Sequence, residues 1–200
     1  PIENVERIVG AQPDSVVSHG CGWARIEKNG RTVQIVTLHT WPQAYAFGAE
    51  DREASRAEHG GDKYRRMEIE YICRHTIGSV PGAEGQLWMM MGDFNARSRV
   101  DNAVYGYPED DTRLLVHDYI LQNTPYADVI AERYPGEFKT TIHGQARIDF
   151  VYCTRPLCDR ITHAEVITDA FTDPVRDPDG LAKFWHPSDH RPILVDFNME

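Results

Sequence analysis

Two short runs with the residue types of β-strands, 21–27 and 32–39, stand out in the first fifth of the chain. They are separated by Lys-Asn-Gly-Arg, and Asn-Gly is the dipeptide most typical of a tight turn between antiparallel strands. This part of the sequence therefore predicts a β-hairpin.

Helical patterns are expected in residues 1–10, 50–58, 62–77 and 112–121. The first is a short helix through Val5, Ile8 and Val9. The third is predicted to start at Asp62, a good N-cap residue, and to stop before Gly78. Its buried stripe is predicted to comprise Tyr64, Met67, Tyr71 and Ile72. The inward residues of the fourth are predicted to be Leu114, Leu115 and Leu121.

Further strands are expected in the second half of the chain. Residues 86–91 form a continuous apolar run, which indicates a strand buried on both faces. Residues 147–154, 164–168 and 192–197 predict three more. Strands alternate with helices early and follow one another later, so the expected fold class is α/β (α+β), a mixed sheet with helices packed on one face.

Length and composition indicate one soluble globular domain, residues 1–200. The chain has 200 residues, of which 41% are hydrophobic and 26% charged. Its longest apolar run, 87–91, is far shorter than the roughly 20 residues of a membrane span. No signal peptide is visible, and the chain begins with Pro1 in place of a methionine, so the compartment stays unknown.

The net charge of −10 argues against a protein that coats DNA or RNA, because such binding neutralises phosphates with basic residues. It leaves room for an enzyme with a metal-filled cleft, since a divalent cation reverses the local field. The four cysteines lack CxxC spacing. Reduced, mostly buried thiols are favoured over a Cys153–Cys158 bridge.

Polar residues interrupt or follow the apolar strands at four places. Asp93 and Asn95 come just after the run 86–91, and their i, i+2 spacing points both side chains to the same side of an extended chain. Asp149 lies inside an apolar strand, where a carboxylate needs a partner such as a histidine or a metal. His39 ends the second hairpin strand.

The last of these places is the pair Asp189 and His190, directly before the final strand. Oxygen ligands suit a hard cation such as Mg²⁺, and Asp–His pairs suit proton transfer. Each cluster alone is weak, because a strand-end acid is more often a turn or cap residue. In combination they are the parts of a metal-assisted phosphoester hydrolase.

Three motifs in the second half of the chain resemble signatures of the endonuclease/exonuclease/phosphatase family: Gly92-Asp93-Phe94-Asn95-Ala96, Arg147-Ile148-Asp149-Phe150 and Ser188-Asp189-His190-Arg191-Pro192-Ile193. A fourth, Leu38-His39-Thr40-Trp41-Pro42, is similar to the strand-end histidine motif of pancreatic-type deoxyribonuclease. The resemblance runs from about residue 20 to the end. It implies a mixed-sheet α/β sandwich of the deoxyribonuclease-like type.

The resemblance also implies roles for the motif residues. Asp189 would be a metal ligand, and His190 would contact the scissile phosphate and take part in proton transfer. Asp149 would orient His190 and raise its basicity. Asp93 and Asn95 would position water and phosphate and hold a second metal, and His39 would stabilise charge on a phosphate oxygen. The implied cofactor is Mg²⁺ or Mn²⁺.

One part of the family pattern has no counterpart. The family's principal metal ligand is a glutamate well before the histidine motif, and only 38 residues precede His39 here. Glu3, Glu6 and Glu27 do not end an apolar strand as that glutamate does. The resemblance therefore implies that part of the N-terminal half is lacking, and that this segment of the same protein is a partner of the chain.

Weaker features leave alternatives open. Arg97 and Arg99 follow Asp93 and either clamp a substrate phosphate or lie in a solvated loop. Trp185, like Trp41 and Phe184, either walls the cleft or packs in the core. His186 and His190 have the spacing of a helical zinc pair, which Pro187 opposes. Asp173, Asp177 and Asp179 resemble a calcium loop faintly, and an ordinary turn is favoured.

These observations predict a phosphodiesterase or phosphatase that uses a divalent cation and a His–Asp pair to activate water. The alternatives are a nuclease acting on DNA or RNA and a non-catalytic binding domain that keeps the fold. The acidic charge slightly favours a small or lipid-linked phosphoester over nucleic acid.

Overall fold

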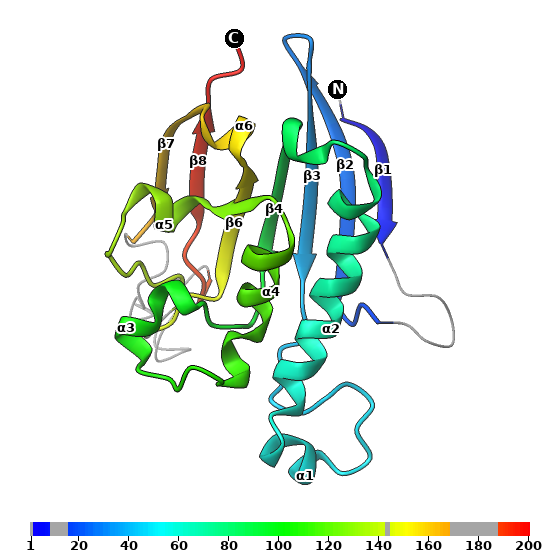
Figure 1. Ribbon diagram of the computed structural model, residues 1–200, viewed down its shortest axis with the longest axis vertical. Coiled ribbons are helices and arrows are strands. Elements are labelled where there is room, and N and C mark those ends of the chain that lie inside the picture. The colour runs from blue at the N-terminus through cyan, green and yellow to red at the C-terminus, as the bar shows by residue number, and fades with distance from the viewer. Residues whose placement is uncertain (1, 9–15, 143–144, 169–187) are drawn as a thin grey trace, which may run out of the picture.

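The computed structural model describes residues 2–8, 16–142, 145–168 and 188–200 (Figure 1). Its main layer is a six-stranded sheet in the order β1-β2-β3-β4-β6-β5. Strand β4 runs parallel to β3, and the other neighbours pair antiparallel, so the predicted mixed sheet is confirmed. The strands of this sheet are β1 (Ile2–Ile8), β2 (Gly20–Lys28), β3 (Arg31–His39), β4 (Leu87–Asp93), β5 (Tyr126–Asp128) and β6 (Asp149–Thr154).

Helices cover one face of this sheet, and a second, two-stranded sheet lies on the other. The long helix α2 (Gly60–His75) and α4 (Leu115–Asn123) lie side by side in front of the strands in Figure 1. Strands β7 (Ile161–Val166) and β8 (Ile193–Phe197) pair antiparallel behind β6. The layers form an α/β sandwich. The short helices are α1 (Arg52–Ala57), α3 (Asn102–Tyr105), α5 (Val129–Arg133) and α6 (Arg155–Cys158), with 3₁₀ turns at Ile77–Ser79, Ala83–Gly85, Arg99–Asp101 and Thr112–Leu114.

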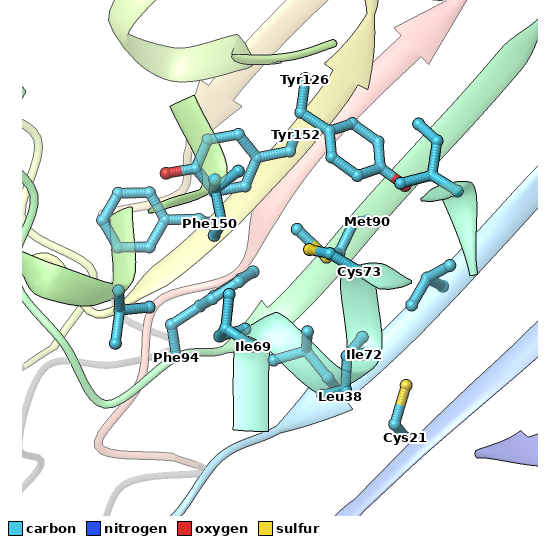
Figure 2. Packing of buried hydrophobic residues seen from close by; sticks show 14 of the residues in the cluster. Cys21, Leu38, Ile69, Ile72, Cys73, Met90, Phe94, Tyr126, Phe150 and Tyr152 are labelled. Atoms are coloured by element: carbon cyan, nitrogen blue, oxygen red, sulfur yellow. The ribbon is translucent and has the colours of Figure 1, made fainter. Parts of the chain in front are cut away.

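Each side of the main sheet has its own apolar core. Figure 2 shows the larger core, in which Leu38, Met90 and Phe150 of the sheet meet Ile69 and Ile72 of α2. In the smaller core, Val33, Val151 and Cys153 of the opposite face pack with residues of β7 and β8, namely Ala164, Ile193 and Val195. Because side chains alternate along a strand, the odd-numbered residues of β3, β4 and β6 face the second sheet.

Several sequence predictions are confirmed by these elements. The hairpin forms as β2 and β3, with Asn29 and Gly30 in the turn at positive φ. Helix α1 starts where expected, and the Asp51 carboxylate caps it by accepting from Glu53 N and Ala54 N. All four cysteines are free thiols. No helix in the described part of the chain is long and apolar enough to cross a membrane.

The N-terminal segment is a strand, so the predicted helix at 1–10 is wrong. Residues Ile2–Ile8 pair antiparallel with β2 from Ile2–Ile26 to Ile8–Cys21, with a shift of register between Glu3 and Glu6. The spacing of Val5 and Ile8 suits a helix, but an isolated helix of under about 12 residues is marginal. Pairing with an available strand edge supplies the backbone hydrogen bonds that such a helix cannot hold.

The predicted start of the long helix is also wrong, and its predicted inward face is right only in part, because Ile72 is buried and Tyr71 packs against the larger core but Met67 is exposed. Helix α2 begins at Gly60, and Asp62 lies in its first turn, bound to Arg65 at 2.6 Å. Met67 is 56% exposed. The buried face is Arg65, Glu68, Ile69, Ile72 and Cys73. Two charged residues on this face concealed its apolar pattern. Leu114, in the 3₁₀ turn before α4, is buried as expected, whereas Leu121 of α4 is 36% exposed.

Candidate active site at the end of the main sheet

Four polar residues meet where β3 and β4 end and β6 begins. In the sheet register His39 is the partner of Asp93, and Asp93 is the partner of Asp149. All three are odd-numbered and therefore stand on the face opposite the helices. His190 comes from the segment before β8, which lies over this face. The structure thus brings together four of the residues singled out in the sequence.

Asp149 and His190 form a hydrogen-bonded pair. The Nδ1 atom of His190 lies 3.0 and 3.1 Å from the two carboxylate oxygens of Asp149. The backbone N–H of His190 donates to Ser188 Oγ at 3.0 Å, and His190 bridges to Ile142. With Nδ1 facing the carboxylate, Nε2 is the imidazole nitrogen that remains available.

Thr141, which sequence reasoning missed, holds this pair in place. Its buried hydroxyl accepts hydrogen bonds from the backbone N–H of Ile148 at 3.0 Å and of Asp149 at 3.1 Å. Its carbonyl accepts from Arg191 N at 2.7 Å. One residue therefore holds the backbone of Asp149 and that of Arg191, the residue that follows His190. Its position depends on long-range packing, so no sequence motif marked it.

Asp93 is tied to Asn95 and lies close to His39. Asp93 Oδ1 accepts a hydrogen bond from Asn95 N at 2.8 Å, and Asp93 Oδ2 lies 3.6 Å from His39 Nε2. Asn95 has a left-handed backbone with φ 47°, and its Nδ2 donates to Thr40 O at 3.2 Å. The predicted pairing of Asp93 with Asn95 is thus a turn that fixes the end of β4.

Gly92 permits β4 to approach β3 just before the site. Its φ is +145°, and a Cβ atom there would lie 1.9 Å from the carbonyl oxygen of Leu38. No side chain fits in that space, so only glycine allows His39 and Asp93 to stand on adjacent strand ends.

Burial and mutual charge shift the ionisation of the site. Burial raises the pKa of Asp149, although hydrogen bonds from Thr141 and His190 oppose this. Burial lowers the pKa of His190, but the hydrogen bond and charge of Asp149 outweigh it, so the pKa is raised overall. Burial lowers the pKa of His39, against the attraction of Asp93. His190 is therefore the imidazole more inclined to hold a proton.

The donor atoms fit a divalent cation. Ligand atoms of Asp93, Asp149 and His190 all lie within 4.8 Å of one another, and they are the one such group among the described residues. Two carboxylates and an imidazole suit Mg²⁺ or Mn²⁺. These residues line part of a cavity of about 420 Å³, which also includes Met91 and Ile193.

The other predicted site residues lie outside this group. The Asp189 side chain is 75% exposed, with Oδ1 4.0 Å from His190 Nε2. Arg99 binds Asp118 at 2.7 Å and faces Glu109 at 3.5 Å, so its charge already has partners. Arg97 lies over the ring of Tyr105. Several predicted residues fall outside the part of the chain that the structure describes: Trp185, Phe184, His186 and the acidic residues 173, 177 and 179.

Comparison with known proteins places the fold. No family model matches the chain, and no curated protein matches it in sequence. Solved structures do match. An AP endonuclease from Archaeoglobus fulgidus has a TM-score of 0.62 at 18% identity, over 100% of this chain and 72% of that one. A mannosyl-6-phosphatase from Bacteroides thetaiotaomicron has a TM-score of 0.57 at 15% identity, over 90% and 57%.

A third match is an endonuclease/exonuclease/phosphatase from Bacteroides vulgatus, with a TM-score of 0.57 at 18% identity over 100% of this chain and 67% of that one. The chain spans between 57% and 72% of the length of these three structures. The fold is therefore that of the endonuclease/exonuclease/phosphatase structures, which confirms the resemblance read from the motifs. This fold is shared by hydrolytic phosphoesterases.

Proposed function

We propose that this protein is a divalent-metal-dependent phosphoester hydrolase. The observation that carries the proposal is the Asp149–His190 pair, with distances of 3.0 and 3.1 Å, beside Asp93 and His39 at one end of the sheet. A structural pair of this kind has no need of further polar groups converging on it. In a phosphoester hydrolase each of the four groups has a task.

Each residue has a distinct task in this proposal. His190 holds or moves a proton at Nε2, because Nδ1 is engaged by Asp149. Asp149 fixes the orientation of the imidazole and favours its charged form. Asp93 positions the attacking water. His39 donates from its ring to a phosphate oxygen and so stabilises the charge that develops there.

Within the donor group of Asp93, Asp149 and His190, the last two engage each other, so the metal would be held by Asp93 and by the exposed Asp189, whose Oδ1 lies 4.0 Å from His190 Nε2. Asn95, whose backbone N–H donates to Asp93 Oδ1, would lie beside it. When bound, Mg²⁺ or Mn²⁺ supplies positive charge that stabilises the phosphate and lowers the pKa of a water. The chain's own residues orient the substrate and transfer the proton.

Small phosphoesters are the proposed substrates. A net charge of −10 opposes the approach of long polyanionic DNA or RNA. Among the structures with this fold, the one named a mannosyl-6-phosphatase acts on a small phosphoester, which supports the same class here. Proteins named as endonucleases share the fold, so nuclease activity belongs in the test.

The test is a hydrolysis assay with Mg²⁺ or Mn²⁺ on the full-length protein. Its substrates are nitrophenyl phosphate, bis-nitrophenyl phosphate, a sugar phosphate, sphingomyelin and plasmid DNA. We expect Asp189→Ala and His190→Ala each to lower the rate at least about a hundredfold. The matched control is Asp159→Ala, an exposed acid in the turn before β7. Near-normal hydrolysis by the His190 variant would remove that residue from the mechanism. Hydrolysis that does not depend on the metal would remove the cation from the proposal, and absent hydrolysis would favour a binding domain.

A further inference from the structure

The row of polar residues at the end of the sheet continues past His39 toward β2. Gly20, the first residue of β2, is the register partner of His39, and His19 directly precedes it. The ring centroids of His19 and His39 lie 4.7 Å apart, and those of His19 and Trp41 lie 5.7 Å apart. Asp149, Asp93, His39 and His19 therefore stand at the ends of four neighbouring strands.

A buried carboxylate holds both segments that flank this extension. Glu68 of α2 is 0% exposed. Its Oε1 accepts hydrogen bonds from Ser18 N at 2.8 Å and Ser18 Oγ at 2.5 Å, and its Oε2 accepts from Trp41 N at 2.8 Å. The two oxygens thus bind the residue before His19 and the backbone of Trp41. Because both oxygens face N–H donors, an amide in place of the carboxylate leaves one donor unmatched.

The loop after Trp41 is anchored as well. Arg65 donates to Trp41 O at 2.7 Å and Gln43 O at 2.9 Å. A Cβ atom on Gly61 would lie 2.2 Å from Gln43 O, so the loop is seated directly on the first turn of α2. Figure 1 shows this loop and α1 projecting past the end of the sheet.

The anchored loop presents aromatic rings beside His19. The Trp41 ring lies 5.1 Å from that of Phe47, which is 50% exposed. His19 is exposed, its Nδ1 lies 3.3 Å from Ser18 Oγ, and within the described residues its Nε2 has no hydrogen-bond partner. An imidazole both donates and accepts hydrogen bonds, and an aromatic face packs against C–H groups.

We propose that His19 and Trp41 form a subsite that binds the organic part of the phosphoester, a hydroxylated ring, and that Glu68 is its positioning residue. The inference rests on the proposed function, which places the phosphate at His39 and His190. Ring hydroxyls match the free imidazole nitrogen, and the ring's C–H face matches the aromatic surface. A sugar and a cyclitol share this chemistry.

The first test is His19→Ala in the full-length protein, assayed with mannose 6-phosphate, an inositol phosphate and glycerol phosphate. We expect KM for the ring substrates to rise about tenfold, the effect of losing one hydrogen bond, with kcat within about twofold. Inhibition by inorganic phosphate should not change. His163→Ala, a partly exposed histidine on β7, is the control. An unchanged KM, or weaker inhibition by phosphate, would overturn the subsite.

The second test separates positioning by Glu68 from general stability. Glu68→Gln should raise KM for the same ring substrates and leave kcat unchanged. In the double variant with His19→Ala, the increase in log KM should be smaller than the sum of the two single increases. Glu70→Gln on the exposed side of α2 is the control. Additive effects, or a fall in kcat alone, would contradict a positioning role.

A third measurement does not depend on hydrolysis. Histidine ring signals are followed by NMR while mannose 6-phosphate or inorganic phosphate is added. We expect the His19 signal to move with the sugar phosphate and not with phosphate alone. A His19 signal that stays fixed, or that responds equally to inorganic phosphate, overturns the subsite. Absence of hydrolysis with a His19 response would instead count against the proposed function alone.

Discussion

The side chain and the backbone of Asp149 have different partners, so its chemical and structural roles can be tested apart. Its carboxylate lies 3.0 Å from His190 Nδ1, and its backbone N–H donates to the Thr141 hydroxyl. Asp149→Asn keeps the shape and the Thr141 contact but removes the negative charge beside the imidazole. We expect the rate of hydrolysis to fall at least about a hundredfold, which is typical of removing a general-base partner, with little change in Tm. A large fall in Tm with activity retained would make Asp149 a structural residue.

His117 makes stability depend on pH from inside the larger core. It is fully buried, hydrogen-bonds to Tyr152 OH at 2.7 Å through Nδ1, and burial lowers its pKa to about 3. The charge of Arg147 contributes to the same shift. In the unfolded chain the imidazole takes up a proton below its ordinary pKa of about 6.5, while the folded chain does not. The folding stability that the neutral imidazole contributes is therefore fully present above about pH 6.5. It is lost as the pH falls from there toward 3.

We expect wild type to lose up to about 1.4 kcal/mol of unfolding free energy per pH unit through His117 below pH 6.5. His117→Gln should remove that slope. Urea unfolding at pH 7.5 and 5.5 measures how the unfolding free energy of each protein changes with pH. The carboxylates titrate at lower pH and are the same in both proteins, so their effect cancels in the comparison. The partly exposed His163→Gln should keep the wild-type slope. Equal slopes for wild type and His117→Gln would show that the imidazole is protonated in the fold.

The sequence predicted those site residues that stand at strand ends inside recognisable motifs. Asp93 and Asp149 stand at the ends of apolar strands, where alternation along the strand gives the side of each side chain, and His190 directly precedes the last strand. Thr141, Glu68 and His19 were missed because their roles depend on packing between distant segments. Glu68 reaches across 50 residues to Ser18, and no local pattern encodes that contact.

At the scale of elements, a buried ionic network attaches β6 to its surroundings. Arg147 is 1% exposed and binds Asp101 at 2.8 Å and Asp128 at 2.7 Å. Asp128 also caps α5 by accepting from Ala131 N. The network joins the segment before β6 to β5 and to the 3₁₀ turn Arg99–Asp101, and Asp149 follows two residues later. Breaking it would displace the start of β6, the strand that carries Asp149.

Arg147→Met tests this attachment. It leaves two buried carboxylates without their counter-charge, and we expect a loss of about 3–5 kcal/mol in unfolding free energy. Arg155→Met is the matched control, because Arg155 also binds a carboxylate, Glu132 at 2.7 Å, but is exposed. That change should cost less than about 1 kcal/mol. Similar losses for both variants, measured by urea unfolding, would show that the buried network does not hold β6.

The elements that the sequence misassigned are those decided by long-range pairing. The Asn-Gly turn determines the β2–β3 hairpin locally, so it was predictable. Residues 2–8 and β5 are strands because a neighbouring edge was available, and a three-residue strand such as Tyr126–Asp128 has no periodicity of its own. The inward face of α2 was obscured because Arg65 and Glu68 are buried by the loops they bind.

At the scale of the whole molecule, the two β-layers are unequal. Six strands form the main sheet and two the second, as far as the described residues go. The face toward the second sheet keeps Ile35, Met89 and Met91 only partly buried. The chain also spans 57% to 72% of the length of three structures with its fold. A partly covered apolar sheet face favours association with further protein.

These features argue that the 200-residue chain, taken alone, binds Mg²⁺ weakly and self-associates. Mg²⁺ usually takes one or two carboxylates plus water and substrate phosphate. Here Asp149 is engaged by His190, Asp93 accepts from Asn95, and Asp189 is 75% exposed. We expect a Kd on the order of millimolar by calorimetry, abolished by Asp93→Asn, together with light scattering above that of a monomer. Micromolar binding by a monomeric chain would mean that a further ligand lies within these 200 residues.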